Sequence, residues 1–233
     1  MLAEALAGRA SFRRFCGLAR EEATPERPAF VRFRRQLVAH GLAQSLVASI
    51  TRALEQKGAF VRKGTPIDAT VIASASKGDK EAAWGKHKSR PPMPGDKAHI
   101  RAGKETGMIR AVETTPANAA AVSVAPSLLP DRPGEANADR AYDALAVEKA
   151  IEAKGGLSQL MRKGHRWLPA KKLAMHNRPL RRVRSRIATI FGTWKRTYRL
   201  RHMRWIGLVK ATRQGHRAAI AYNVKRLFRL QSV

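Results

Sequence analysis

Residues 65–76, with the sequence TPIDATVIASAS, place a single carboxylate inside a short apolar stretch. Ile67, Thr70 and Val71 are β-branched, which favours a β-strand. Asp68 is a poor residue for a strand interior, and a buried acid is costly unless it is bound to something positive, such as a metal ion. The segment therefore predicts a strand that carries either a metal-binding acid or an acid that caps a turn.

The positive charge of the chain is large and unevenly distributed. The formal net charge is +29, which favours a polyanionic partner, most simply nucleic acid. Residues 153–233 contain 22 Lys and Arg and no Asp or Glu. We therefore expect this third of the chain to face phosphate groups, and no carboxylate there can serve a catalytic site.

Membrane segments and disulfides are not expected. The sequence has no run of about 18 apolar residues, so nothing is expected to span a bilayer. The first residues lack the apolar core of a signal peptide. Cys16 is the single cysteine, which excludes an intramolecular disulfide and fits a reducing cytoplasm. Cys16 itself is expected to be a small core residue rather than a nucleophile.

The first half of the chain predicts helices followed by strands. Residues 1–57 are expected to be helical, with two helices joined near Gly41. These form either a helical hairpin packed on the core or a DNA-binding helix-turn-helix. Residues 76–95 are rich in proline and glycine and predict a loop. Residues 96–103 and 107–115 predict two strands joined by a short turn.

The second half predicts mainly helices. A helix is expected over residues 117–124 and is ended by Pro126, and a short strand is expected to end in Asp139. Another helix is expected over residues 144–154, and residues 157–180 are basic and irregular. The remaining residues predict a long helical stretch with breaks near Gly192 and Gly207. Its apolar stripe contains Val183, Ile187, Ile190, Phe191 and Trp194.

Two aspartates occupy comparable places in this order of elements. Asp68 lies on the first strand and Asp139 ends a later one, which suggests an α/β fold with a ribonuclease-H-like mixed sheet. Helices would flank that sheet, and a helical N-terminal region would precede it. Mg²⁺ prefers hard oxygen ligands, and two such ions about 4 Å apart can hydrolyse a phosphodiester. A third carboxylate from a later helix would complete such a site.

Several blocks of the sequence resemble the DDE transposases of bacterial insertion sequences, in particular the IS-five group. The blocks cover nearly the whole chain and occur in the family's order. They are SFRRFCGL, IDATVIAS, DKAHIRAGKETGMIRAVETTPAN, ADRAYD, RSRIATIFGTWKRTYRLRHMRWIGL and AYNVKRL. The resemblance implies metal-dependent cutting and joining of double-stranded DNA at element ends and target, with Mg²⁺ as cofactor and a homodimer as the assembly.

The resemblance also implies roles for individual residues. Asp68 and Asp139 match the first and second catalytic, metal-binding aspartates. The family's third block has an Arg, a Glu four residues later and a Lys seven residues after that. Arg184 and Lys195 match its two basic positions and are expected to contact DNA. They are eleven residues apart, so a helix presents both on one face.

The third block departs from the family pattern at its acidic position. Ala188 stands where the Glu is expected, and Arg181 stands where the family has a Tyr. The N-terminal segment is also shorter than is usual in the family. The sequence thus resembles a truncated and decayed transposase in which strand cleavage is impaired.

Three functional interpretations follow. The first is an impaired DNA transposase, with a helical region over residues 1–57, a catalytic domain over 58–200 and a basic helical extension over 201–233. The second is a non-catalytic DNA-binding remnant that occupies element ends. The third is a structural basic protein such as a ribosomal component, which the ordered Asp68 and Asp139 blocks disfavour.

Two further groups of residues have open roles. Lys97 and His99 lie in a predicted strand and are either phosphate or site contacts or simply solvated or core-edge residues. Aromatic residues interleave with arginines in the last block and either stack on unpaired bases or pack in the apolar stripe. Packing is the favoured interpretation for this group, which comprises Trp194, Tyr198, Trp205 and Tyr222.

Overall fold

The computed structural model describes residues 2–56, 64–87 and 90–231. Within these ranges, no helix is both long enough and apolar enough to cross a bilayer. The chain divides into two compact units, residues 1–46 and 47–233. The elements in order are α1 Leu2–Gly8, α2 Ala10–Phe15, α3 Arg27–Ala39, α4 Leu42–Gln56, β1 Thr65–Ala73, β2 Ala83–His87, β3 Arg90–Ala102, β4 Ile109–Pro116, α5 Ala121–Leu128, β5 Glu135–Ala138, the 3₁₀ turn η1 Arg140–Tyr142, α6 Leu145–Ala153, β6 Leu157–Leu160, α7 Ala170–Arg196 and α8 Leu208–Gln231.

The first unit consists of short helices. Two helices meet at Gly41 as predicted, and this glycine has a φ of 61°, a left-handed conformation that ends a helix at little cost. The prediction that Cys16 is a core residue is wrong, because its side chain is exposed. Cys16 directly follows α2, a six-residue helix with no buried side chain, so there is no local core for it to join.

The second unit is built on a mixed six-stranded sheet. β1 lies at its centre, antiparallel to β3 on one side and parallel to β5 on the other. β5 continues in parallel to β6, while β3 pairs antiparallel with both β2 and β4. This arrangement confirms the predicted α/β class and is consistent with a ribonuclease-H-like fold.

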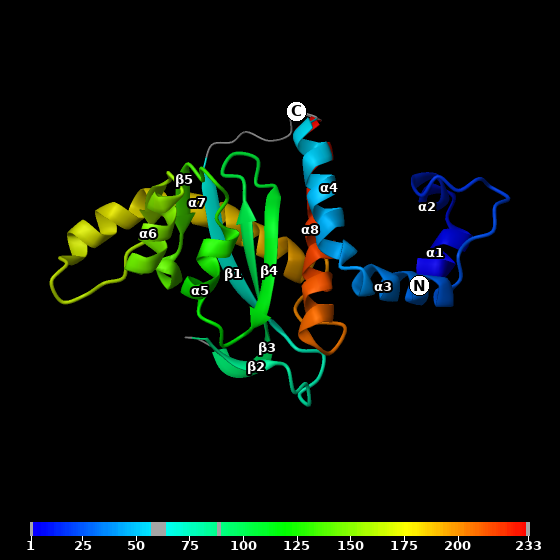
Figure 1. Ribbon diagram of the computed structural model, residues 1–233, viewed down its shortest axis with the longest axis horizontal. Helices are drawn as coiled ribbons and strands as arrows, with labels where there is room; N and C mark the ends of the chain where they lie inside the picture. The colour runs from blue at the N-terminus through cyan, green and yellow to red at the C-terminus, as the bar shows by residue number, and fades with distance from the viewer. Residues whose placement is uncertain (1, 57–63, 88–89, 232–233) are drawn as a thin grey trace. The chain divides into compact units, whose positions relative to one another are not determined.

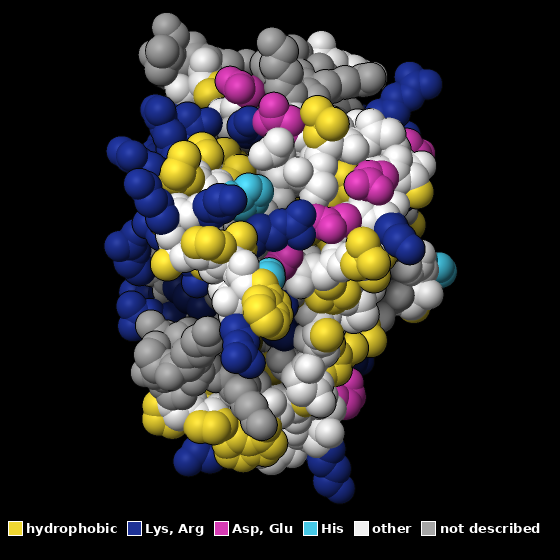
Figure 2. Space-filling model, turned by 90° about the vertical axis from the view of Figure 1, so that its left-hand side faces the viewer, with side chains coloured by type: hydrophobic (Ala, Val, Ile, Leu, Met, Phe, Trp, Pro, Cys, Tyr) yellow, Lys and Arg dark blue, Asp and Glu magenta, His cyan; other side chains and the backbone are white. Residues whose placement is uncertain are grey.

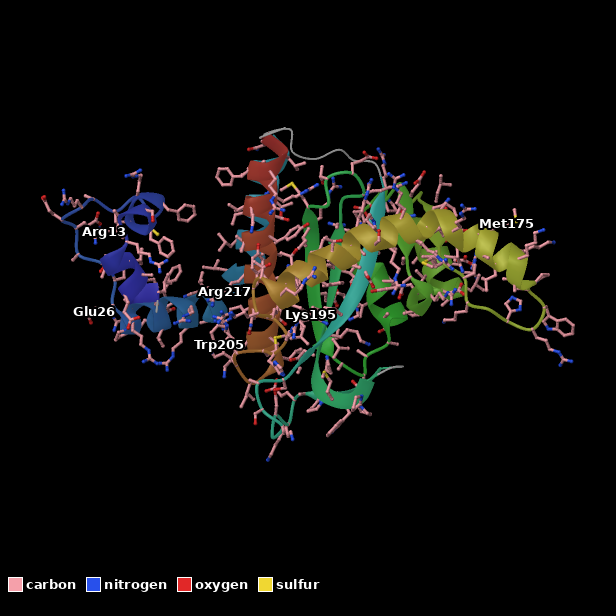
Figure 3. The ribbon with its side chains drawn as sticks, turned by 180° about the vertical axis from the view of Figure 1, so that it is seen from behind. Arg13, Glu26, Met175, Lys195, Trp205 and Arg217 are labelled. Carbon is pink, nitrogen blue, oxygen red and sulfur yellow. The ribbon has the colours of Figure 1, made fainter. Side chains whose placement is uncertain are left out.

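Helices cover both faces of the sheet and enclose two hydrophobic cores. α5 and α6 pack on one face through residues such as Val124, Leu128 and Ile151. α7 and α8 pack on the other face around Trp194, which is fully buried. Figure 1 shows α5 in front of the sheet and α7 passing behind it, and Figure 3 shows α7 crossing the opposite face obliquely. Four residues of the predicted apolar stripe are confirmed as part of this second core, namely Ile187, Ile190, Phe191 and Trp194, while Val183 is half-buried outside it.

The prediction of a loop over residues 76–95 is wrong in its second half. β2 and the start of β3 form an antiparallel pair in which Trp84 lies opposite Pro94. Proline is tolerated in a strand where its missing N–H is not needed by a partner, as along the edge of a sheet. The tertiary pairing with β1 and β2 therefore overrides the local turn propensity of this segment.

Gly95 makes the closest backbone approach in this region. A Cβ atom at Gly95 would lie 2.2 Å from the carbonyl oxygen of Ile72 in β1. We expect Gly95→Ala to lower the free energy of unfolding by about 1–3 kcal/mol, because β1 and β3 would have to separate. Urea denaturation measures this change, with Gly78→Ala as the control, since its nearest atom is 3.7 Å away. Equal losses in the two variants would contradict the prediction.

Three other predicted boundaries are corrected by the structure. Pro126 lies inside α5 and does not end it, because Val124, Ala125 and Leu128 are buried around it. The region predicted to be irregular contains β6 and the beginning of α7. Gly192 does not break α7, whereas the predicted break at Gly207 is confirmed.

Candidate functional site

Asp68 and Asp139 lie beside each other on neighbouring strands. β1 and β5 run in parallel with Ile67 opposite Ala138, so the residue that follows each of these is an aspartate. Asp139 comes directly after β5, and its Oδ1 accepts a hydrogen bond of 2.9 Å from Ala141 N, which fixes the first turn of η1. Two acids that are 71 positions apart in the sequence are thereby brought to one place on the sheet.

The two aspartates share the face of the sheet that α7 covers. Ile72 and Ile100, which share the face of Asp68 by strand alternation and pairing, pack against α7 in the second core. Arg184 projects from the middle of α7, and its Nη2 lies 3.5 Å from Asp139 Oδ2. The predicted DNA contact Arg184 therefore forms an ion pair with one of the predicted metal ligands.

Asp68 is strongly perturbed by its surroundings. Its side chain is 8% exposed, and burial raises its pKa to about 7, with a further contribution from the negative charge of Asp139. The N–H of Ala69, which donates to Asp68 Oδ1 at 2.8 Å, and the Arg184 guanidinium partly offset this rise in pKa. A carboxylate in this position is poorly compensated and favours either a proton or a cation.

Asn137 adds a third oxygen to this region. Two residues before Asp139 along the strand, Asn137 shares its face, and both residues line a small pocket with Arg184. Asn137 is 5% exposed, and its Oδ1 has no hydrogen-bond partner in the described structure. Two carboxylates and an unpartnered amide oxygen fit a hard divalent cation such as Mg²⁺, which prefers oxygen ligands.

A third acidic ligand is absent from this arrangement. In the ranges that the structure covers, no group of three His, Cys, Asp or Glu side chains is placed to hold a metal ion. Ala188 is exposed on α7, one helical turn after Arg184. The donor set therefore fits one divalent ion better than two.

Lys195 lies at the end of α7, on the same face as Arg184. Its Nζ donates a hydrogen bond of 3.0 Å to the carbonyl oxygen of Val71, three residues beyond Asp68 on β1. Figure 3 shows Lys195 near the end of the helix opposite to Met175. Of the two matched basic residues of the third block, Arg184 thus reaches Asp139 after β5, and Lys195 reaches the central strand β1.

Lys97 and His99 do not reach the aspartates. They alternate with Ala98 and Ile100 on β3, so they share the sheet face opposite to Asp68. His99 is fully buried, with Nε2 3.0 Å from Thr115 Oγ1 and Nδ1 3.4 Å from Tyr142 Oη. Burial lowers the pKa of His99 to about 4, so it is a neutral core residue at physiological pH.

Asp143 is held away from the pair by its own partners. Its carboxylate accepts hydrogen bonds from Arg162 Nη1 at 3.1 Å and from Lys163 N at 2.6 Å. Arg162 also forms an ion pair with Glu148. Arg162 therefore ties the segment after β6 both to Asp143, which follows η1, and to Glu148 of α6. Asp139 is the acid of the ADRAYD block that lies beside Asp68.

Most aromatic residues of the last block pack in the core, as the sequence favoured. Trp194 is fully buried, and Tyr198 and Tyr222 pack against the second core. Trp205 lies beside the guanidinium of Arg217, whose carbon is 5.6 Å from the ring centroid. The buried ring of Trp194 cannot stack on a base unless the core opens.

Two buried asparagines that were not predicted from the sequence fasten α7, which carries Arg184 and Lys195, and α8, which packs on the same face of the sheet. Asn177 of α7 exchanges two hydrogen bonds with the backbone of Arg162. Asn223 of α8 does the same with the backbone of Ile109 at the start of β4. Asn223 stands between Tyr222 and Val224 in a stretch predicted to be helical, which was an available signal, whereas Asn177 lies in the basic segment that was predicted to be irregular. Asn137 could have been noted as the amide in the short strand before Asp139.

The surface near α7 is strongly basic. Figure 2 shows Lys and Arg side chains gathered along one edge of the molecule and few acidic side chains among them. α7 alone contributes Lys171, Lys172, Arg178, Arg181, Arg182, Arg184, Arg186, Lys195 and Arg196. The predicted phosphate-facing role of the C-terminal third fits this distribution of charge.

Comparisons with known proteins give consistent results. A family model described as the transposase DDE domain matches residues 59–224. The transposase for insertion sequence element IS1106 of Neisseria meningitidis serogroup B is 28% identical over 221 residues, which cover 84% of this chain and 76% of that relative. No solved structure matches the chain.

Proposed function

Because the chain belongs to the family of transposase DDE domains, we propose that Asp68 and Asp139 are its catalytic carboxylates and hold Mg²⁺. The function of the chain is DNA transposition, as in the transposases of insertion sequences, and DDE domains depend on a divalent metal. The observation that carries the proposal is the parallel pairing of β1 and β5, which sets the two aspartates side by side beneath Arg184.

The acidic and basic residues of the site have separate roles in binding the metal ion and the DNA. Asp68, whose pKa burial raises, loses its proton when a cation binds, while Arg184 balances the charge of Asp139 until then. When bound, a divalent cation activates water and stabilises the leaving oxygen of the phosphodiester. Arg184 exchanges its ion pair with Asp139 for one with a DNA phosphate. Lys195, further along α7, holds the same DNA strand.

We also propose that strand cleavage is impaired in this chain, because Ala188 supplies no third carboxylate. Catalysis by this route depends on stabilising charge at both the attacking and the leaving oxygen, and a weaker metal site stabilises less of it. The alternative, a non-catalytic remnant that occupies element ends, is favoured by the same residue. Both versions retain DNA binding.

Incubation of the purified chain with a duplex that carries the ends of its element, in Mg²⁺ or Mn²⁺, tests these proposals. We expect the chain to bind the duplex tightly and to cleave it orders of magnitude more slowly than a transposase whose site has all three carboxylates. The Asp139→Asn variant should not cleave it. Cleavage of equal rate in both proteins would exclude Asp139 as a catalytic ligand. Efficient cleavage by the unaltered chain would refute the impairment, and complete absence of metal-dependent nicking would favour the remnant.

The remaining assignments rest on the sequence blocks quoted above. We propose that the chain belongs to the IS-five group, acts as a homodimer on double-stranded DNA at element ends and target, and divides functionally into residues 1–57, 58–200 and 201–233. Light scattering of the chain with and without element-end DNA tests the homodimer.

A further inference from the structure

The segment after α7 forms an open basic hollow that the proposed catalytic site does not use. The hollow has a volume of about 410 Å³ and is lined by Lys195, Arg196, Arg199, Arg201 and His202. We call it the α7-end hollow. Every residue that lines it carries a basic side chain, and no described carboxylate forms an ion pair with Arg199 or Arg201. A concave surface with positive charge and without acids attracts a polyanion.

The hollow stands on a rigid support. Leu200 and Met203, on either side of Arg201, are buried in the second core. The backbone between them pairs with the end of β1, since Ala73 N donates to Arg201 O at 3.1 Å and Met203 N donates to Ala73 O at 2.7 Å. The backbone that carries these arginines is therefore held by hydrogen bonds and by buried neighbours, which reduces the entropy lost when the arginines bind a ligand.

Arg199 adopts a conformation that an arginine rarely takes. Its φ is 55°, in the left-handed region, just after the end of α7, where helices commonly place a glycine. The hydrogen bonds from Tyr198 N to Thr193 O and from Leu200 N to Trp194 O hold the chain in this turn. These bonds fix the backbone from which the Arg199 side chain extends.

Lys195, which lines the hollow, lies a fixed number of residues along α7 from Arg184, which pairs with Asp139. Arg184 and Lys195 are separated by three turns of α7, or about 16 Å along its axis. That length corresponds to about five base pairs of duplex DNA, which rises 3.4 Å per step along each strand. Lys195 lines the hollow, and its Nζ also donates a hydrogen bond to the carbonyl oxygen of Val71 on β1.

We propose that the α7-end hollow binds the phosphate backbone of double-stranded DNA, about five base pairs from the phosphodiester that faces Asp68 and Asp139. Arg199 and Arg201 supply the main contacts, and Lys195 and Arg196 form the wall on the side of α7. The distance to the cut rests on the proposed function, whereas the binding of DNA by the hollow does not.

The test measures binding of a 30-base-pair DNA duplex of arbitrary sequence by fluorescence anisotropy over a series of salt concentrations. The variants are Arg199→Gln, Arg201→Gln and the double variant. For each lost phosphate contact we expect the slope of log affinity against log salt to fall by about 0.9. Arg132→Gln is the matched control, because Arg132 is also exposed and also has a φ of 55° but lies outside the hollow.

Arg199→Gly separates a binding role from a structural one. Glycine relieves the left-handed strain, so we expect this variant to melt at a higher temperature than the unaltered chain while it binds DNA more weakly. Slopes for the two hollow variants that equal the slope of Arg132→Gln would overturn the proposal. Tighter binding of an RNA duplex, with the same dependence on Arg199 and Arg201, would overturn DNA as the partner.

Single neutral methylphosphonates along the duplex then locate the contact relative to the cut. A methylphosphonate about five positions from the cleaved bond should weaken DNA binding by the unaltered chain but not by the double variant. If no cleavage is obtained from any variant, the catalytic proposal fails while the salt slopes still report on the hollow. If cleavage proceeds and the slopes do not change, the proposal for the hollow fails alone.

Discussion

Ala188→Glu is expected to increase the rate of metal-dependent DNA strand cleavage by at least about 100-fold. Ala188 lies one turn after Arg184 on α7, and Arg184 already reaches Asp139. Residues 184, 188 and 195 fall within about 40° of one another around the helix axis, so a glutamate at 188 would share the side of α7 from which Arg184 reaches Asp139 and Lys195 reaches Val71 O. A third carboxylate there would raise the affinity for a divalent cation and complete the set of ligands for a second ion.

The substitution should not disturb the fold, because Ala188 is exposed and glutamate is a good helix former. Gel assays of single-turnover cleavage on element-end DNA measure the rate. Ala188→Gln, which has the same size without the charge, is the matched control and should remain as slow as the unaltered chain. The double variant Ala188→Glu with Asp139→Asn should also be slow. A fast glutamine variant would show that bulk rather than charge limits the reaction.

Asp68→Asn is expected to stabilise the chain at pH 8 by roughly 4 kcal/mol, the free energy that corresponds to a pKa raised from 3.8 to about 7. The folded chain holds the Asp68 proton more tightly than the unfolded chain does. Its stability therefore falls as the pH rises from about 4 to about 7, where the carboxylate ionises without sufficient compensation. Asparagine cannot ionise, so this loss disappears in the variant.

Urea denaturation at pH 5 and pH 8 measures the effect. The gain from Asp68→Asn should be about 1.6 kcal/mol at pH 5 and near its full value at pH 8, and Asp131→Asn, at an exposed position, serves as the control. Mg²⁺ at millimolar concentration should stabilise the unaltered chain more at pH 8 than at pH 5, since the cation competes with the proton. An equal gain at both pH values would contradict the burial of an ionised Asp68.

The sequence could predict the parts of the fold that local pattern determines. The β-branched residues around Asp68 predicted β1, and the apolar stripe with Ile187 and Trp194 predicted the buried face of α7. β6 could not be predicted, because Leu157 is exposed and its strand character comes from pairing with β5. The same holds for Pro94, whose place in β3 depends on strands that lie elsewhere in the chain.

The candidate site was predictable only in part. The resemblance to a known family pointed to Asp68, Asp139, Arg184 and Lys195. The structure brings the two aspartates together on the sheet face beneath α7, with Arg184 of α7 beside Asp139 and Lys195 of α7 on the backbone of β1. The orphaned oxygen of Asn137 depends on burial, which no local pattern reveals. The α7-end hollow depends on a turn that the core imposes through Leu200 and Met203.

The helical stretch from Arg184 to Lys195 contains no proline, since Pro179 lies before it. In the proposed mode of DNA binding, this part of α7 is therefore a spacer of fixed length. In that mode of binding it would set how far the bound duplex extends beyond the place where it is cut, in steps of about 1.5 Å per residue. One added residue would rotate the α7-end hollow by about 100° around the axis of α7 and turn it away from the DNA. We therefore expect the proposed DNA contact to tolerate a substitution in this stretch better than an insertion or a deletion.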